Sequence, residues 1–183
     1  EDRAALRDEV RRIAARHPGD RLAALCLARA EMLNDDPVAA EAILAPFAGD
    51  DSTDTDALRF MARALMQQAD ALFARARGML ARAYRQDPMD YRIIFGIAEN
   101  RRRSPGYPND NDLETLAVAV ELAPQVMDVR FAAAQAFMAR QRYAEAIAYL
   151  SPVANNPHGG DRLQPARDML AEARRLLAEQ TGG

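Results

Sequence analysis

The sequence contains no lysine, no tryptophan and a single cysteine in 183 residues. All 24 of its lysine-plus-arginine positions are therefore arginine, a bias that is typical of a GC-rich genome. One cysteine cannot form a disulfide within the chain, so cysteine usage leaves both a cytoplasmic and a periplasmic location open. Cys26 falls on an apolar helix face, where we expect it to serve packing and not chemistry.

Further absences exclude several classes of function. No apolar run approaches the roughly 18 residues that a membrane span needs, and no secretory signal is present. The formal net charge of −3 argues against a nucleic-acid-binding protein, which usually needs a basic face. A glycine-rich phosphate loop and a serine with a histidine partner are both missing, so we predict no catalytic residues and no cofactor.

No side chains have the spacing of a metal site. His17 and His158 occupy equivalent turns, and neither has a second histidine, a cysteine or a carboxylate at ligand spacing. The acidic loop over 50–56 lacks the glycine and the glutamate that a calcium loop carries at its sixth and twelfth positions. We therefore predict no bound metal.

The residues that are present favour helices. Apolar residues make up 49% of the chain and aromatic residues 6%, which argues against both disorder and a β fold. The stretch 127–157 contains two amphipathic helical patterns joined by a polar turn at Gln141 and Arg142. Such a hairpin buries only one face, so it needs similar neighbours to stack against.

The neighbours form an internal repeat of about 34 residues. Small residues are needed where the two helices of a hairpin cross, because close backbone approach tolerates little more than a methyl group. Alanine recurs at this place, at Ala134, Ala98, Ala62 and Ala28. A second position repeats as leucine, at Leu150, Leu116, Leu80 and Leu44. Prolines, which cannot continue a helix, mark the ends of units at Pro18, Pro88, Pro124 and Pro157.

A unit of this length, with helix, turn, helix and a final proline, resembles the tetratricopeptide repeat (TPR), and the resemblance covers nearly the whole chain. The chain departs from the family pattern in lacking tryptophan and in having alanine where the first helix has glycine. The resemblance implies an all-α fold, a right-handed α-solenoid of TPR-like hairpins with about ten helices and a C-terminal capping helix. Within a single superhelical domain over 1–183, we expect a half repeat, four repeats and the capping helix at 1–18, 21–54, 55–88, 91–124, 127–157 and 162–180.

Individual residues predict where helices begin and end. Asp20 is expected to cap the first helix of its hairpin, and Pro37 to begin the partner helix in its first turn. Pro46 lies deeper in that second helix, which should therefore kink or end early. Asn111 followed by Glu114 predicts a capping box for the second helix of the third hairpin.

The first predicted helix, over 2–16, carries apolar residues at second-helix positions and has no first helix before it. The sequence also begins at Glu1 and not at methionine. Both observations favour a C-terminal segment of a larger protein. The late stretch SPVANNPHGG resembles the tails of bacterial proteins that join such repeats to a predicted peptidase domain.

In the TPR family, first helices line a concave groove, and the resemblance implies that the same helix positions line a partner-binding groove here. The implied groove residues are Arg29, Met32, Arg59, Arg63, Arg92, Phe95, Arg102, Phe131 and Gln135. The family's carboxylate clamp uses lysine and asparagine at such positions, and this chain has neither there. Arginines interleaved with phenylalanine and methionine instead favour an extended or helical peptide that is acidic and apolar.

We therefore expect a non-catalytic protein–protein interaction module with no nucleic acid partner and no membrane span. The sequence does not determine its oligomeric state. The alternative is an accessory segment of a larger enzyme, such as a peptidase, whose groove packs against an upstream domain of the same chain. The arginine triplet 101–103 beside Tyr107 has two interpretations: a clasp for an acidic partner or phosphate backbone, and a complement to the dipole at a helix C-terminus.

Overall fold

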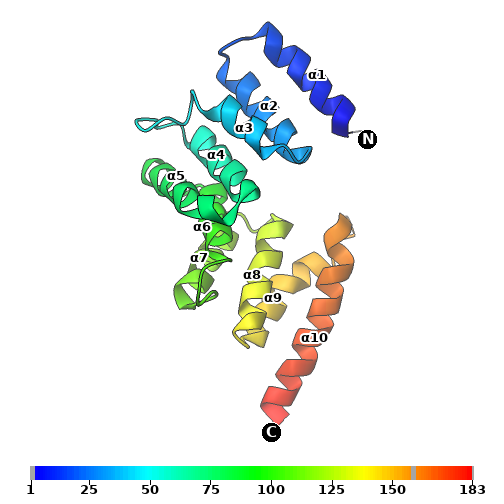
Figure 1. The fold of residues 1–183 in the computed structure, drawn as a ribbon. Helices are drawn as coiled ribbons and strands as arrows, with labels where there is room; N and C mark the ends of the chain where they lie inside the picture. Colours follow the sequence, from blue (N-terminus) through cyan, green and yellow to red (C-terminus); the bar gives the residue numbers. More distant parts are fainter. Residues whose placement is uncertain (1–2, 158–159, 183) are drawn as a thin grey trace. The chain divides into compact units, whose positions relative to one another are not determined.

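The computed structural model describes residues 3–157 and 160–182, and every regular element in these ranges is helical (Figure 1). The described residues form ten α-helices and two short 3-10 helices, which confirms the predicted all-α class of TPR-like hairpins. The chain folds as two compact units, unit 1 over residues 1–100 and unit 2 over residues 101–183. The boundary lies inside the third predicted hairpin, and the single superhelical domain stays a prediction.

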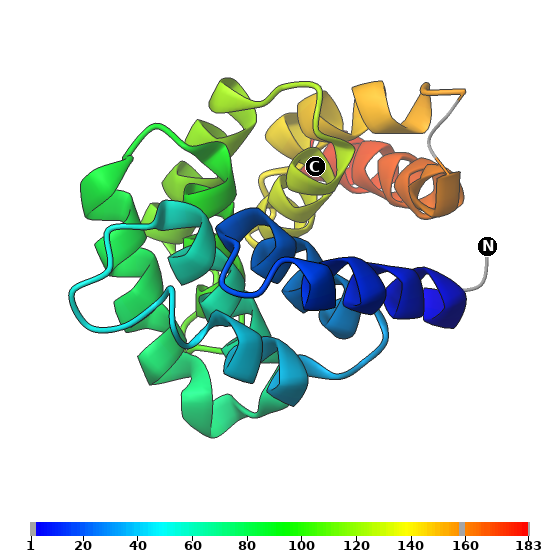
Figure 2. The same ribbon diagram turned by 90° about the horizontal axis from the view of Figure 1, so that it is seen from above.

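Unit 1 is a row of helices in which each helix from α1 to α4 packs on the next (Figure 2). Its elements are α1 (Arg3–Arg16), α2 (Arg21–Leu33), α3 (Pro37–Leu44), α4 (Thr55–Gln68), η1 (Asp70–Leu72), α5 (Phe73–Gln86) and α6 (Tyr91–Arg101), whose last residue belongs to unit 2. α2 also contacts α4, so the first helices of two successive hairpins lie side by side. The loop between α3 and α4 extends away from the helices (cyan in Figure 1).

Aspartates start three helices of unit 1. The carboxylates of Asp20, Asp36 and Asp54 accept hydrogen bonds from backbone N–H groups in the first turns of α2, α3 and α4, over N···O distances of 2.7, 3.0 and 3.1 Å. The predicted cap at Asp20 and the predicted start of α3 at Pro37 are therefore confirmed. α3 ends before Pro46, whose ring cannot continue the helix.

Alanines occupy the crossings between the helices of unit 1. Ala28 and Ala62, at equivalent places in α2 and α4, are fully buried. They share one core with larger side chains that include Leu25, Met32, Leu44, Leu58, Met61, Leu65, Leu80 and Ile93. A side chain at Gly96 in α6 would require the buried Leu80 to move, since a Cβ atom there would lie 2.9 Å from Leu80 Cδ2. Small residues thus set the distances between the helices.

α1 is attached to unit 1 differently, because none of its residues is buried. Its strongest contact is the guanidinium of Arg11, which donates from Nε and Nη2 to the two carboxylate oxygens of Glu31 at 2.6 and 2.8 Å. Glu31 lies on α2 and is 1% exposed, so this bidentate pair supplies the charge that a buried carboxylate needs. The docking of α1 therefore depends on a polar contact more than on a core.

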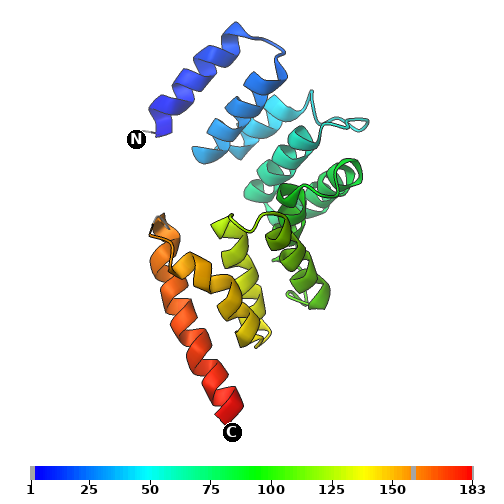
Figure 3. The same ribbon diagram turned by 180° about the vertical axis from the view of Figure 1, so that it is seen from behind.

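Unit 2 contains α7 (Asp110–Leu122), α8 (Met127–Ala139), α9 (Tyr143–Ala154), η2 (Gly160–Arg162) and α10 (Leu163–Gly182). α8 packs on α7 and on α9, and α9 packs in turn on α10 (Figure 3). The apolar faces of α8, α9 and α10 share a core that includes Phe131, Ala134, Leu150, Val153 and Leu170. α10 covers α9, which is the role expected of a capping helix.

The start of α7 differs from the prediction. Asn109 is the N-cap: its Oδ1 accepts from Asp112 N at 3.0 Å, and its own N–H donates to Asp112 Oδ2 at 2.9 Å. The predicted capping box at Asn111 and Glu114 is therefore wrong, and the helix begins earlier. The physical reason is that the buried Asp112 carboxylate also accepts a hydrogen bond from Arg101 Nε at 3.0 Å, which fixes the earlier start.

Candidate protein-binding surface

α2 exposes a face that carries apolar side chains. Leu22, Cys26, Arg29 and Leu33 follow one another at spacings of four, three and four residues, which places them on one side of the helix. All four are exposed, Leu22 to 65% and Leu33 to 43%. Leu25, by contrast, points into the core. α2 therefore has a second partly apolar face that the described residues do not cover.

The equivalent face of α4 carries Asp56, Phe60, Arg63 and Gln67, at the same spacing. Phe60 packs partly against the core of unit 1, and the guanidinium carbon of Arg59 lies 4.4 Å from the centroid of its ring. α2 and α4 are in contact, and Arg21, which precedes Leu22 on α2, is bonded to Asp56 of this set. We call the four residues of α2 and the four of α4 the α2–α4 strip.

An open depression lies where the strip reaches the end of α4. Its lining is mixed: the polar side chains are Asp35, Gln67 and Gln68, and the apolar ones are Pro37, Val38, Ala69 and Leu72. Val38 is an exposed apolar residue at the start of α3. The depression therefore places exposed apolar side chains next to polar ones at the C-terminal end of α4.

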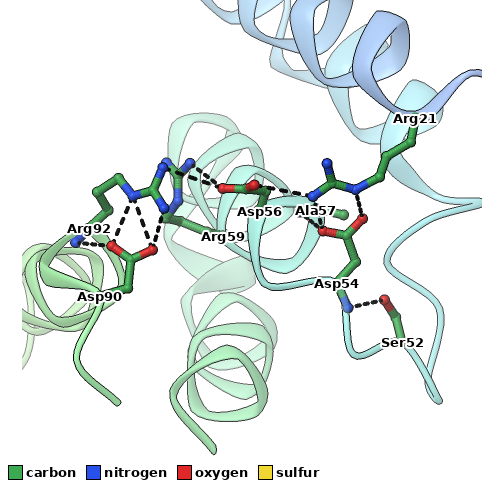
Figure 4. Close-up of polar contacts among 8 residues, drawn as sticks. All are labelled: Arg21, Ser52, Asp54, Asp56, Ala57, Arg59, Asp90 and Arg92. Atoms are coloured by element: carbon green, nitrogen blue, oxygen red, sulfur yellow. Dashed lines mark hydrogen bonds and ion pairs between the residues drawn. The ribbon is translucent and has the colours of Figure 1, made fainter. Parts of the chain in front are cut away.

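Ion pairs join the N-terminal ends of α2 and α4 (Figure 4). Arg21 donates to both carboxylate oxygens of Asp54, at 2.5 and 2.7 Å, and to Asp56 at 3.1 Å. Asp56 also accepts from Arg59 Nη2 at 3.1 Å. The backbone N–H of Asp54 donates to Ser52 Oγ at 3.2 Å, which holds the loop before α4 in place. These contacts fix the register of α2 against α4.

The ion pairs continue to the start of α6. Arg92 donates from Nε and Nη2 to the carboxylate of Asp90, with a shortest distance of 2.6 Å, and its Nη1 lies 3.6 Å from Asp56 Oδ1. Asp90 also accepts from the backbone N–H of Arg92 at 2.8 Å, so it caps α6 while it holds the guanidinium. Each arginine of this network, which Figure 4 shows, thus faces at least one carboxylate.

The arginines lower the pKa values of the carboxyl groups between them. The hydrogen bond from Arg21 is the main reason why the pKa of Asp54 lies below its ordinary value. Burial raises the pKa of Asp56 and of Asp90, but hydrogen bonds from their arginine partners outweigh burial and leave both pKa values below the ordinary one. The three carboxylates are therefore charged at neutral pH and neutralise the arginines beside them.

This network divides the predicted groove arginines into two classes. Arg59 and Arg92 are engaged with carboxylates of unit 1 itself. Arg29 and Arg63 are exposed, and neither has a hydrogen-bond or ion-pair partner in the part of the chain that the structure describes. The two arginines that remain available for a ligand are therefore Arg29 on α2 and Arg63 on α4.

Two other predicted groove residues of unit 1 lie deeper than expected. Met32 is 5% exposed and packs in the core of unit 1, so it does not line a groove. Phe95 on α6 is partly buried. On α2 the exposed apolar residue beside Met32 is Leu33, one position further along, and Cys26 is exposed in the same stripe. The four-three-four spacing of a second stripe on α2 was the signal that could have identified them.

In unit 2 the predicted residues have three different environments. Phe131 is 5% exposed and lies in the core beneath Arg162, whose guanidinium carbon is 5.2 Å from the ring centroid and whose Nε lies 2.9 Å from Asp128. The ring is covered because η2 places Arg162 over α8. Gln135 is partly exposed on α8, and Arg102 is exposed near the start of the unit.

The remaining candidates for chemistry are dispersed. Cys26 is exposed, so the prediction that it serves packing is wrong: the apolar stripe to which it belongs faces solvent. His17 is exposed in the turn before α2, and His158 lies outside the described residues. Within 3–157 and 160–182, no three histidine, cysteine, aspartate or glutamate side chains gather as a metal site requires. The helices of the same residues include none with the length and apolarity of a membrane span.

The fold is a TPR-like helical repeat, and solved structures share it. TTC0263, a thermophilic TPR protein of Thermus thermophilus, matches with a TM-score of 0.75 at 18% identity, over 93% of this chain and 90% of that chain. MamA matches with a TM-score of 0.59 at 15% identity, over 95% and 92% of the two chains. The double mutant MamA RS-1 ArsTM gives 0.58 at 17% identity, over 100% and 99%. These likenesses establish the fold. No protein-family model and no curated protein sequence matches the chain.

Proposed function

We propose that the chain is a non-catalytic protein-interaction module that binds a peptide or protein segment along the α2–α4 strip. The observation that carries the proposal is the exposed stripe of α2, in which Leu22 and Leu33 flank an arginine without a partner in the described part of the chain. Exposed apolar side chains that line up along one helix are typical of helix and peptide docking sites.

The single cysteine makes this proposal testable at one defined place. Peptides selected from a displayed random library against the purified chain should slow the reaction of Cys26 with a maleimide, because a peptide on the strip covers its thiol. The same peptides should bind the double variant Leu22→Ser, Leu33→Ser more weakly. Val118→Ser, which changes an exposed apolar residue on α7, is the matched control and should bind as the wild type does.

Two results would contradict the proposal. The first is a selection that enriches no peptide. The second is a set of peptides that bind the double variant unchanged and leave the labelling rate of Cys26 unaltered, which would locate the interaction elsewhere.

A second candidate function has its own support in α1. Leu6 and Ile13 lie on the same face of α1, two turns apart, and are 59% and 44% exposed. No residue of α1 is buried. An apolar face of this kind favours an accessory role in a larger bacterial protein, in which α1 packs against a preceding domain such as a peptidase. Expression together with any coding sequence upstream should then raise the hydrogen-exchange protection of α1. Unchanged protection would exclude this candidate.

A further inference from the structure

We infer that the occupant of the α2–α4 strip is an amphipathic helix of a partner protein that brings carboxylates to Arg29 and Arg63. The inference rests on the proposed function and adds the conformation and charge of the ligand. It follows from the register of the two helices, from the spacing of the exposed residues and from the one place on the strip where positive charge is not neutralised by the described residues.

The register places Arg29 and Arg63 at the same level. Arg21 is bonded to Asp54 and Asp56, which aligns the first turns of α2 and α4. Arg29 follows Arg21 by eight residues, and Arg63 follows Asp56 by seven. At about 1.5 Å per residue, the two arginines lie about 12 and 10 Å below the aligned ends, on neighbouring helices that typically pack about 8–10 Å apart. Arginine and glutamate have long, flexible side chains, which can make up the difference in level between two carboxylates one turn apart on a ligand helix. Such a pair of carboxylates can then meet both guanidinium groups.

The spacing on α2 favours a helical ligand. The four-three-four pattern of Leu22, Cys26, Arg29 and Leu33 is the pattern of a seam between two packed helices, and it extends over about 16 Å. A helix of about three turns covers this length. Phe60 on α4, together with Val38 and Leu72 of the depression beside Gln67, gives such a helix further apolar contacts.

The charge on the seam selects an acidic ligand. A ligand helix that is apolar throughout would bury Arg29 without a counter-charge, which is unfavourable. The carboxylates around the strip do not remove this cost. Asp54 and Asp56 are already bonded to other arginines, and Asp35, which lines the depression, forms no ion pair with Arg29 among the described residues. An arginine within an otherwise apolar seam therefore favours the binding of acidic helices over that of neutral or basic helices.

The test uses synthetic helical peptides of about 18 residues as probes. One carries a leucine seam with two glutamates one turn apart. Its two twins carry glutamine or arginine in place of the glutamates. Affinity is measured by fluorescence anisotropy at low and at high salt, and the labelling rate of Cys26 reports whether the peptide lies on the strip. The protein variants are Arg29→Gln with Arg63→Gln, and the control Arg85→Gln with Arg174→Gln, which removes the same charge from exposed arginines of α5 and α10.

We expect the glutamate peptide to bind the wild type about two- to thirtyfold more tightly than the glutamine twin, the range that two exposed ion pairs provide. This preference should vanish in the Arg29, Arg63 variant, persist in the control variant and shrink at high salt. Equal binding of the three peptides, or a preference that survives in the Arg29, Arg63 variant, overturns the inference. Self-association of the wild type that this variant abolishes also overturns it, because the occupant is then a second copy of the chain.

The outcomes for the two proposals are separate. If library selection yields strip-binding peptides without acidic residues, the proposed function stands and the acidic helix is wrong. If no peptide of either origin protects Cys26, both proposals are wrong.

Discussion

Replacement of Phe131 by alanine should destabilise unit 2, although the same residue was predicted from the sequence to contact a partner. The ring is 5% exposed and packs in the core formed by α8, α9 and α10. Phe131→Ala therefore removes most of a buried aromatic side chain at a place where three helices meet. Its neighbours, including Leu150 and Val153, are themselves fully buried and can close only part of the resulting cavity.

The packing contribution should dominate the effect. Large-to-alanine changes at buried phenylalanine typically cost about 3–5 kcal/mol, whereas a cation–π contact at an exposed site contributes about 0.5–1 kcal/mol. Arg162, which lies over the ring, is about half exposed. Arg162→Ala should therefore cost less than about 1 kcal/mol, and Phe131→Leu, which keeps most of the volume, less than about 1.5 kcal/mol. The expected order of destabilisation is Phe131→Ala, then Phe131→Leu, then Arg162→Ala.

Urea denaturation of the three variants, with hydrogen exchange to locate the loss, measures this order. Leu22→Ala is the matched control from the strip: its side chain is 65% exposed, so the free energy of unfolding should change by less than about 0.5 kcal/mol. The midpoint of Phe131→Ala should fall and the amides of α8 and α9 should lose protection first. A Phe131→Ala midpoint equal to that of Leu22→Ala would refute the assignment of Phe131 to the core.

Three further predictions concern other parts of the chain. Ala134→Leu should destabilise by about 1–3 kcal/mol through overpacking, whereas Ala139→Leu, on the exposed end of the same helix, should not; equal urea midpoints would contradict the repeat register. Arg11→Ala should release α1, which would appear as lost hydrogen-exchange protection over that helix. Arg12→Ala removes only an exposed ion pair within α1 and should leave the protection unchanged. Similar exchange in the two variants would refute the role of the Arg11 contact. The pKa of Asp90 is lower in the folded chain than its unfolded value of about 4. The contribution of this carboxylate to stability is therefore complete above the unfolded pKa and is lost as the pH falls through the folded pKa. Asp90→Asn should therefore flatten the acid side of the stability profile, and an unchanged profile would count against the ion pair.

Local rules predicted the helices well because local chemistry determines where they start and stop. Asp20 and Pro37 act within their own first turns, so the sequence shows their effect directly. The predicted capping box at Asn111 was wrong for the opposite reason. The true cap depends on a hydrogen bond from Arg101, which lies across a loop, and no short pattern contains that contact.

The candidate site was harder to predict because exposure and pairing are tertiary properties. Arg59 and Arg63 have the same side chain and lie one turn apart, yet among the described residues only the first meets a carboxylate of its own unit. The pair of Arg59 with Asp56 lies within α4, three residues apart, so the sequence could have shown it. The contacts of Arg21 and Arg92 with Asp56 depend on the register between hairpins, which single-helix positions do not encode. On α2, a rotation of one residue separates the buried Met32 from the exposed Leu33.

Asp54 and Asp90 also have a consequence for how unit 1 unfolds. Each carboxylate accepts a backbone N–H of its own helix and a guanidinium, and for Asp54 that guanidinium comes from the preceding hairpin. Local helix formation and the coupling between hairpins are thus carried by the same atoms at Asp54. In a repeat protein, cooperativity depends on the ratio of interface energy to the intrinsic energy of each repeat. A shared carboxylate ties the two quantities together, so fraying of the first turn of α4 and separation of the first two hairpins should occur as one event.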